Sequence, residues 1–91
     1  MSEHAQETVR VVNDLGMHLR AAGALVQLAG RFRAELWLAY RGTRVNGKSI
    51  MSVLSLAAAK GSEILVTADG EDADAAVAAV ADLIRRGFAA P

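Results

Sequence analysis

The hydrophobic and polar positions of this chain change their period along the sequence, and each period predicts a type of secondary structure. An imperfect alternation over Thr8–Val12 predicts a strand with one buried face. Ala34–Tyr40 and Glu63–Ala68 are also typical of strands, and Arg44–Asn46 is expected to return after a short turn as an antiparallel strand. Residues 1–7 are polar and are expected to be a frayed start.

Two longer segments repeat apolar residues at spacings of three and four, which predicts amphipathic helices. The first begins after His18 and ends near Gly30, and the second begins after Asp72 and ends near Gly87. A shorter helix is predicted after Ser49, because serine is favoured at the N-cap position. The apolar faces of the two longer helices comprise Ala21, Ala22, Leu25, Leu28, Ala29 and Phe32 in the first, and Ala73, Ala76, Val77, Val80, Ala81, Leu83, Ile84 and Phe88 in the second.

The predicted order is strand, helix, two strands, helix, strand and helix (β-α-β-β-α-β-α). Four short strands with three amphipathic helices predict a single α+β sandwich over residues 1–91, with a mostly antiparallel sheet and the helices on one face. Trp37 falls on the strand face opposite to Leu36 and Leu38. The second face of the sheet is therefore either open to solvent there or in contact with a partner.

The composition narrows the classes of function. Ten basic and ten acidic residues cancel, and no basic stripe supports a nucleic-acid partner. The chain has no cysteine, which excludes disulfides, thiolate catalysis and cysteine-ligated metals. Neither a signal peptide nor an apolar run near the roughly 20 residues of a membrane span is present. We therefore expect a cytoplasmic protein with no membrane insertion, no bound metal and no cofactor.

The candidate chemistry centres on His18, which stands at the start of the first predicted helix. Free backbone N–H groups and the positive end of the helix dipole favour an anion at such a position. Neutral imidazole is a nucleophile, and a phosphoryl group on its ring would lie where the guanidinium of Arg20 can meet it. These residues favour a site that carries a phosphoryl group. The alternative is a structural histidine that only caps the helix.

A second turn, over 46–49, precedes the short apolar helix. Met51 and its neighbours either belong to the core or form a patch on which partners dock, and methionine suits such adaptable surfaces. Phosphorylation of Ser49 would place an anion beside that patch and change docking by charge. The expected docking surface comprises Met17, Leu19, Ala21, Met51, Ser52 and Leu54.

Two segments resemble signatures of the HPr family, the histidine-containing phosphocarriers of the phosphoenolpyruvate-dependent phosphotransferase system. Gly16–Ala22 resembles the family's G-L-H-A-R-P-A signature, and Val45–Val53 resembles the signature around its regulatory serine. The two segments lie at the family's separation, and the resemblance runs over about residues 8–88. The departures from the signatures are Leu19 for alanine, Ala21 for proline and Ser52 for glycine.

The resemblance implies an open-faced β-sandwich in which the histidine caps the first helix, and a phosphocarrier that is not itself an enzyme. His18 is implied to accept phosphate from Enzyme I, with Arg20 beside it as phosphate stabiliser, and to pass it to an Enzyme II A-type domain. Ser49 matches the serine that an ATP-dependent HPr kinase/phosphorylase modifies in some bacteria. The chain is expected to be a monomer that serves sugar transport. The alternative is a regulatory binding module of nitrogen-branch or carbon-catabolite type, switched by phosphorylation without sugar transport.

Overall fold

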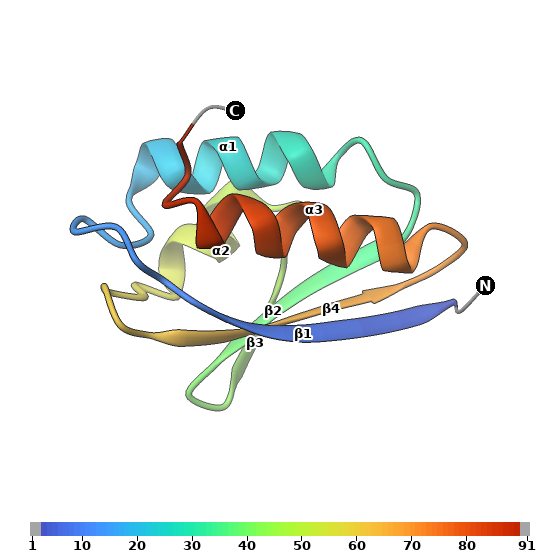
Figure 1. The fold of residues 1–91 in the computed structure, drawn as a ribbon, viewed down its shortest axis with the longest axis horizontal. Helices are drawn as coiled ribbons and strands as arrows, with labels where there is room; N and C mark the ends of the chain where they lie inside the picture. Colours follow the sequence, from blue (N-terminus) through green and yellow to red (C-terminus); the bar gives the residue numbers. More distant parts are fainter. Residues whose placement is uncertain (1–2, 90–91) are drawn as a thin grey trace.

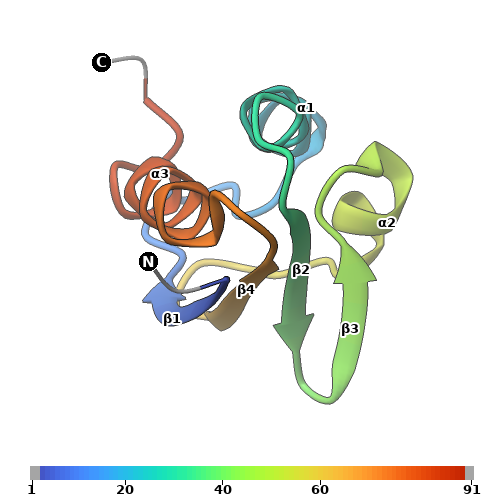
Figure 2. The ribbon, with the colours of Figure 1, turned by 90° about the vertical axis from the view of Figure 1, so that its right-hand side faces the viewer.

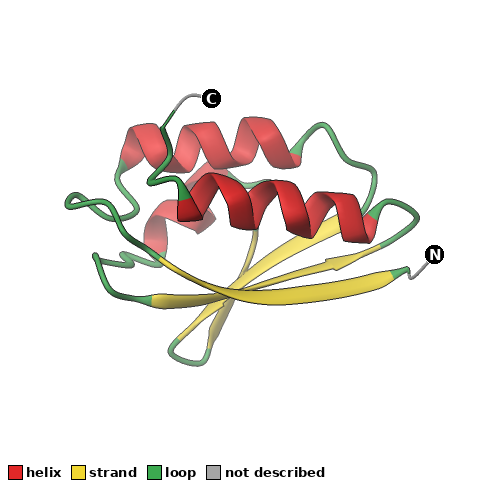
Figure 3. Ribbon diagram, in the orientation of Figure 1, coloured by secondary structure: helices red, strands yellow, loops and turns green. Residues whose placement is uncertain are grey.

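A computed structural model describes residues 3–89 of the chain (Figure 1). Within this range the four strands pair in one antiparallel sheet in the order β1-β4-β2-β3, and three helices cover one face of it (Figures 2 and 3). The predicted α+β fold and its element order are confirmed. The elements are β1 (His4–Arg10), α1 (Leu19–Ala29), β2 (Glu35–Tyr40), β3 (Thr43–Asn46), α2 (Ile50–Ser55), β4 (Glu63–Asp69) and α3 (Ala73–Arg85).

The core lies between the helices and the inner face of the sheet. Leu36 and Leu38 of β2 are fully buried there, as are alternate residues of β4. Trp37 points to the opposite face, as the alternation predicts, and the guanidinium carbon of Arg44 lies 4.3 Å from the centroid of its ring. Such a cation–π contact contributes about 0.5–1 kcal/mol at an exposed site. Part of the outer sheet face is thus covered by the chain's own arginine.

Strand β1 begins at His4, so the prediction of a frayed start is wrong for residues 4–7. These residues pair with β4, from His4 opposite Asp69 to Glu7 opposite Val66. A sheet with one solvated face accepts polar residues at every second position, and this segment therefore needs no hydrophobic run. The carboxylate of Glu7 also forms an ion pair with Arg85 of α3. Residues 1–2 lie outside the described part of the chain.

Asp72 occupies the N-cap of α3, as predicted, but its side chain forms no cap hydrogen bond. Its carboxylate instead accepts the backbone N–H groups of Arg33 at 2.9 Å and of Ala34 at 2.8 Å. These two hydrogen bonds hold the pKa of Asp72 below its usual value of 3.8. Asp72 therefore ties the turn before β2 to the start of α3.

Helix α3 ends at Arg85, and Phe88, predicted on its apolar face, lies in the turn that follows. The N–H of Gly87 donates to the carbonyl of Ile84 at 3.0 Å, and the N–H of Phe88 donates to that of Leu83 at 2.9 Å. This pair of bonds is a Schellman motif, which reverses the chain at a helix end. Phe88 is thereby folded back against the core, where it is half-buried. No helix among the described residues has the length and apolar content needed to cross a membrane.

Candidate phosphoryl site at the start of helix α1

The loop between β1 and α1 is fixed by several hydrogen bonds. Gly16 adopts a positive φ of 63°, and its N–H donates to the carbonyl of Asn13 at 3.1 Å. The Asn13 side chain returns a bond from Nδ2 to the carbonyl of Gly16 at 2.8 Å. The N–H of Met17 donates to the carbonyl of Ala58 at 2.8 Å, which ties the loop to the segment after α2. His18 follows Met17 directly, so these hydrogen bonds also fix the backbone position of His18.

His18 is the N-cap residue of α1, as the family resemblance implies, with an extended backbone. Its carbonyl accepts the N–H of Ala22 at 2.9 Å, and its ring nitrogen Nδ1 accepts the N–H of Ala21 over a long distance of 3.4 Å. A neutral imidazole that accepts at Nδ1 carries its proton on Nε2. The Nδ1 lone pair is therefore directed at the N–H groups that have no partner within the helix.

Arg20 lies in the first turn of α1 and is exposed. Across residues 3–89 its guanidinium forms neither a hydrogen bond nor an ion pair, and that first turn contains no acidic residue. A cation near the positive end of a helix is unfavourable by about 0.3–1 kcal/mol, the reverse of the usual stabilisation by acids. An anion bound at His18 would compensate both the helix dipole and this guanidinium. The start of α1 thus combines the positive end of a helix dipole with a guanidinium that no acidic residue of the first turn neutralises.

A cavity of about 660 Å³ opens beside His18. The sequence did not identify Leu15, Gly87 and Phe88 as part of this site, although all three line the cavity. Leu15 lies in the loop before His18, but Gly87 and Phe88 come from the opposite end of the chain. Only the packing of α3 beside α1 brings that end to the site (Figure 1). The full lining is Leu15, His18, Leu19, Arg20, Ala21, Ala24, Gly87 and Phe88.

The predicted docking residues divide between surface and core. Leu19 and Met51 are 62% and 68% exposed, whereas Met17 and Ala21 are 4% and 1% exposed. Met17 and Ala21 cannot present side chains to a partner, because Ala21 lies on the buried face of α1 and Met17 belongs to the same core. The side chains of these two predicted docking residues are therefore not accessible at the surface. The other two predicted members are half-buried: Ser52 and Leu54.

Ser49 stands at the N-cap of α2, as predicted, but its side chain makes no cap hydrogen bond. Helix α2 packs directly on α1, since a Cβ atom added to Gly23 would lie 3.7 Å from Cδ1 of Ile50. Ser49 and His18 thus occupy the N-terminal ends of two helices in contact. The half-buried Ser49 hydroxyl is not engaged in stabilising the helix that it begins.

The second histidine, His4, forms an ion pair with Asp69, with 2.6 Å between Nδ1 and the carboxylate. This hydrogen bond raises the pKa of His4 above its usual value of 6.5. Within the described part of the chain, no group of three or more His, Cys, Asp or Glu residues could hold a metal ion.

The fold and the site define a class of small α+β domains, in which an open-faced sandwich presents a histidine at the N-terminus of a helix. The chain belongs to the HPr family of the phosphotransferase system, because the family model described as the PTS HPr component phosphorylation site matches residues 5–86. Members of this family are phosphocarrier proteins and not enzymes.

Individual relatives agree with this assignment. The phosphocarrier protein HPr of Neisseria meningitidis serogroup A is 42% identical over 83 residues, which cover 91% of this chain and 93% of that protein. The crystal structure of HPr-C-His from Thermoanaerobacter tengcongensis matches with a TM-score of 0.90 and 33% identity, covering 96% of this chain and 98% of that one. A crystal structure of an HPr dimer from the same organism matches with a TM-score of 0.75 and 34% identity, covering 99% and 100%. The open-faced β-sandwich is therefore confirmed.

Proposed function

We propose that this chain carries a phosphoryl group on Nδ1 of His18, which it accepts from phosphorylated Enzyme I and passes to an Enzyme II A-type domain. The observation that supports this most is the position of Nδ1, 3.4 Å from the backbone nitrogen of Ala21 at the start of α1. In the accepting step the Nδ1 lone pair attacks phosphorus, the P–N bond forms and the bond to the donor breaks. In the donating step the P–N bond breaks and its electron pair returns to the ring.

The surroundings of Nδ1 favour the phosphorylated state without making it permanent. Phosphoryl oxygens would accept hydrogen bonds from the N–H groups of the first turn and from the Arg20 guanidinium. These would replace the long hydrogen bond from the Ala21 N–H to the His18 ring. Such charge-assisted hydrogen bonds are roughly twice as strong as neutral ones. Arg20 is exposed to approaching partners, so a partner that offers its own donors can compete for the same oxygens. Reversible transfer follows from that competition.

The test is phosphorylation by phosphoenolpyruvate and Enzyme I. We expect an acid-labile, base-stable phosphoramidate on wild-type protein and none on His18→Ala. His4→Ala is the matched control, since it removes the chain's other histidine, and it should be labelled like the wild type. Labelling of His18→Ala at the wild-type level would contradict the assignment.

A regulatory binding module is the second candidate function, and the free Ser49 hydroxyl at the N-cap of α2 favours it. In this case an ATP-dependent HPr kinase/phosphorylase modifies Ser49, and the added charge beside exposed Met51 switches binding to a regulator. Onward transfer separates the two functions. Phosphorylated protein is mixed with every Enzyme II A-type domain of the source organism, and failure with all of them favours regulation over sugar transport.

We also propose that the protein acts in the cytoplasm as a monomer. Enzyme I and its recipients must all reach His18 and the exposed Leu19, so a dimer that covered these residues would block transfer. The HPr of Thermoanaerobacter tengcongensis has a dimeric crystal structure, so the oligomeric state of this chain needs a direct measurement. Sedimentation equilibrium at working concentration should give the mass of one chain.

A further inference from the structure

We propose that Phe88 is a positioning residue of the phosphoryl site, an apolar wall that keeps water from one side of phosphorylated His18. The inference rests on the proposed carrier function. Phe88 and His18 line the same cavity, and Phe88 is the only residue with a benzene ring among the described residues of that lining. The lining also contains Arg20, whose guanidinium could donate to phosphoryl oxygens, whereas the benzyl group of Phe88 could offer them no hydrogen bond.

The backbone holds Phe88 in a conformation that a bulky residue rarely adopts. Its φ is 65°, and the preceding Gly87 has a φ of 69°. A non-glycine residue in this left-handed region is strained, and such strain persists only where the surrounding structure fixes it. Here the N–H of Phe88 is held by the carbonyl of Leu83 at 2.9 Å. Strained residues of this kind cluster at functional sites, and this one stands beside the histidine.

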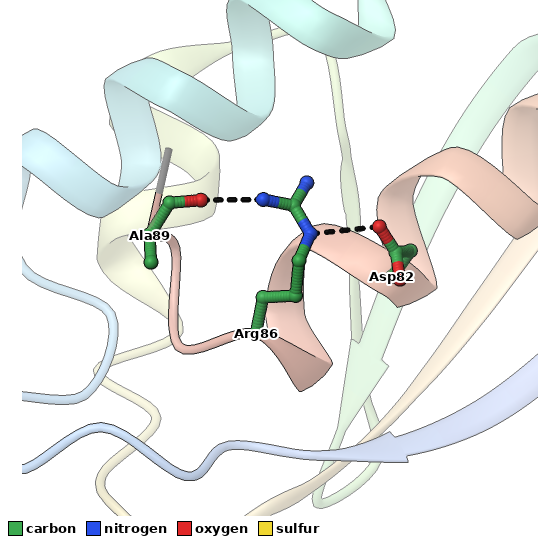
Figure 4. A network of polar contacts seen from close by, with 3 residues as sticks. All are labelled: Asp82, Arg86 and Ala89. Carbon is green, nitrogen blue, oxygen red and sulfur yellow. Dashed lines mark hydrogen bonds and ion pairs between the residues drawn. The ribbon is translucent and has the colours of Figure 1, made fainter. Parts of the chain in front are cut away.

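Side-chain contacts of Arg86 also span this turn (Figure 4). The Nε of Arg86 lies 2.7 Å from the carboxylate of Asp82, and its Nη1 donates to the carbonyl of Ala89. The guanidinium therefore links the last turns of α3 to the residue that follows Phe88. The Arg86 contacts and the Schellman motif together fix the ring at the cavity, so that Arg86 acts through Phe88 and not on the phosphoryl group.

The chemistry that the wall would suppress is hydrolysis of the carrier's own phosphoramidate. In that step a water oxygen attacks phosphorus, the P–N bond breaks, the imidazole nitrogen gains the proton and inorganic phosphate leaves. A carrier must hold its phosphoryl group between donor and recipient, and exclusion of water protects reactive intermediates from this loss. Partner enzymes replace the solvent at the open side of the cavity during transfer.

The experiment measures the hydrolysis rate of phosphorylated protein by ³¹P NMR at neutral pH. All variants carry His4→Gln, so that His18 is the one histidine, and are phosphorylated with the small-molecule donor potassium phosphoramidate. This hydrolysis assay does not need Enzyme I. A failure of the proposed function would appear separately, as the absence of labelling by phosphoenolpyruvate and Enzyme I.

Phosphorylated Phe88→Ala should hydrolyse about 3- to 10-fold faster than the parent, because water gains access from the side that the ring covers in the parent. Phe88→Leu, which keeps apolar bulk, should hydrolyse at a rate within about twofold of the parent. The hydrolysis rate of Arg86→Ala should lie between those of Phe88→Leu and Phe88→Ala. Phe32→Ala is the matched control, since Phe32 is likewise a half-buried phenylalanine packed on the core but lies beyond the far end of α1. Equal rates for Phe88→Ala and the parent, or equal acceleration by Phe32→Ala, would overturn the inference.

Discussion

Replacement of Gly16 by alanine should disturb both the stability of the fold and the position of His18. A Cβ atom at residue 16 would lie 2.5 Å from the carbonyl oxygen of Ala58 and 2.9 Å from Cα of Ala59, whereas ordinary contacts lie at 3.4–4 Å. Both neighbours are backbone atoms, so no side-chain rotation relieves the overlap. The loop must move by roughly 1 Å, and the hydrogen bond from Met17 to Ala58 moves with it.

The magnitude follows from three contributions. An L-residue in the left-handed conformation costs about 1–2 kcal/mol, and overpacking adds about 1–3 kcal/mol. Alanine also lowers the conformational entropy of the unfolded chain, which stabilises the folded state by about 0.4–1 kcal/mol. We therefore expect Gly16→Ala to lower the free energy of unfolding by about 1–5 kcal/mol. Gly42→Ala is the matched control, because Gly42 also has a positive φ, 81°, but nothing lies within 4 Å of its Cβ position. Its loss should be about 1 kcal/mol.

Urea denaturation followed by circular dichroism measures this difference, and an unchanged m-value shows that both variants unfold alike. The rate of His18 phosphorylation by Enzyme I supplies the functional readout. A displacement of about 1 Å near a reacting group can cost 10²-fold in rate, so Gly16→Ala should be slowed far more than Gly42→Ala. Equal stability losses in the two variants would show that the overlap at Ala58 is relieved without cost, and the reasoning would fail.

Two further predictions concern Asp72 and Ser49. The pKa of Asp72 is lowered by its backbone partners Arg33 and Ala34, so its contribution to stability is complete above the unfolded value of 3.8 and is lost as pH falls through the lower folded value. Asp72→Asn should be less stable at neutral pH and should show a shallower acid dependence in urea denaturation; an unchanged acid dependence would argue against this role. Ser49→Asp should raise the KM of Enzyme I for this protein several-fold, because it adds charge beside the exposed apolar surface. Ser55→Asp, at the exposed C-terminal end of the same helix, is its control, and equal effects of the two would refute a local action.

The sequence predicted local features well, because periodicity and capping depend on neighbouring residues. The boundaries of α1 and the placement of Trp37 on the outer sheet face follow from spacing, whereas the N-cap role of His18 was implied by the family resemblance. The start of β1 was missed because its residues have no apolar run, and their pairing with β4 depends on the far half of the chain.

Other features depend on contacts between distant segments and could not be read from the sequence. Asp72 was expected to cap its own helix, but its carboxylate bonds two backbone N–H groups that precede β2. Phe88 has the spacing of a helical core residue, yet a Schellman turn ends the helix first and places the ring at the site. Met17 and Ala21 lie within three residues of His18 in the chain, and only their packing shows that they face the core.

At residue 21 this chain has alanine where the family signature has proline, and this difference changes the hydrogen-bond donors around His18. The family signature has proline at this position, and proline has no N–H. In this chain the Ala21 N–H is the group that donates to Nδ1 of His18. That N–H has no acceptor within α1, since the first donors of a helix lack internal partners, so alanine adds a donor to the site without removing a helical bond. Alanine gives up the preset φ of proline in the first turn, but burial of its methyl group at 1% exposure holds the residue in place. The substitution therefore exchanges rigidity of the backbone for one more N–H at the position that a phosphoryl group would occupy.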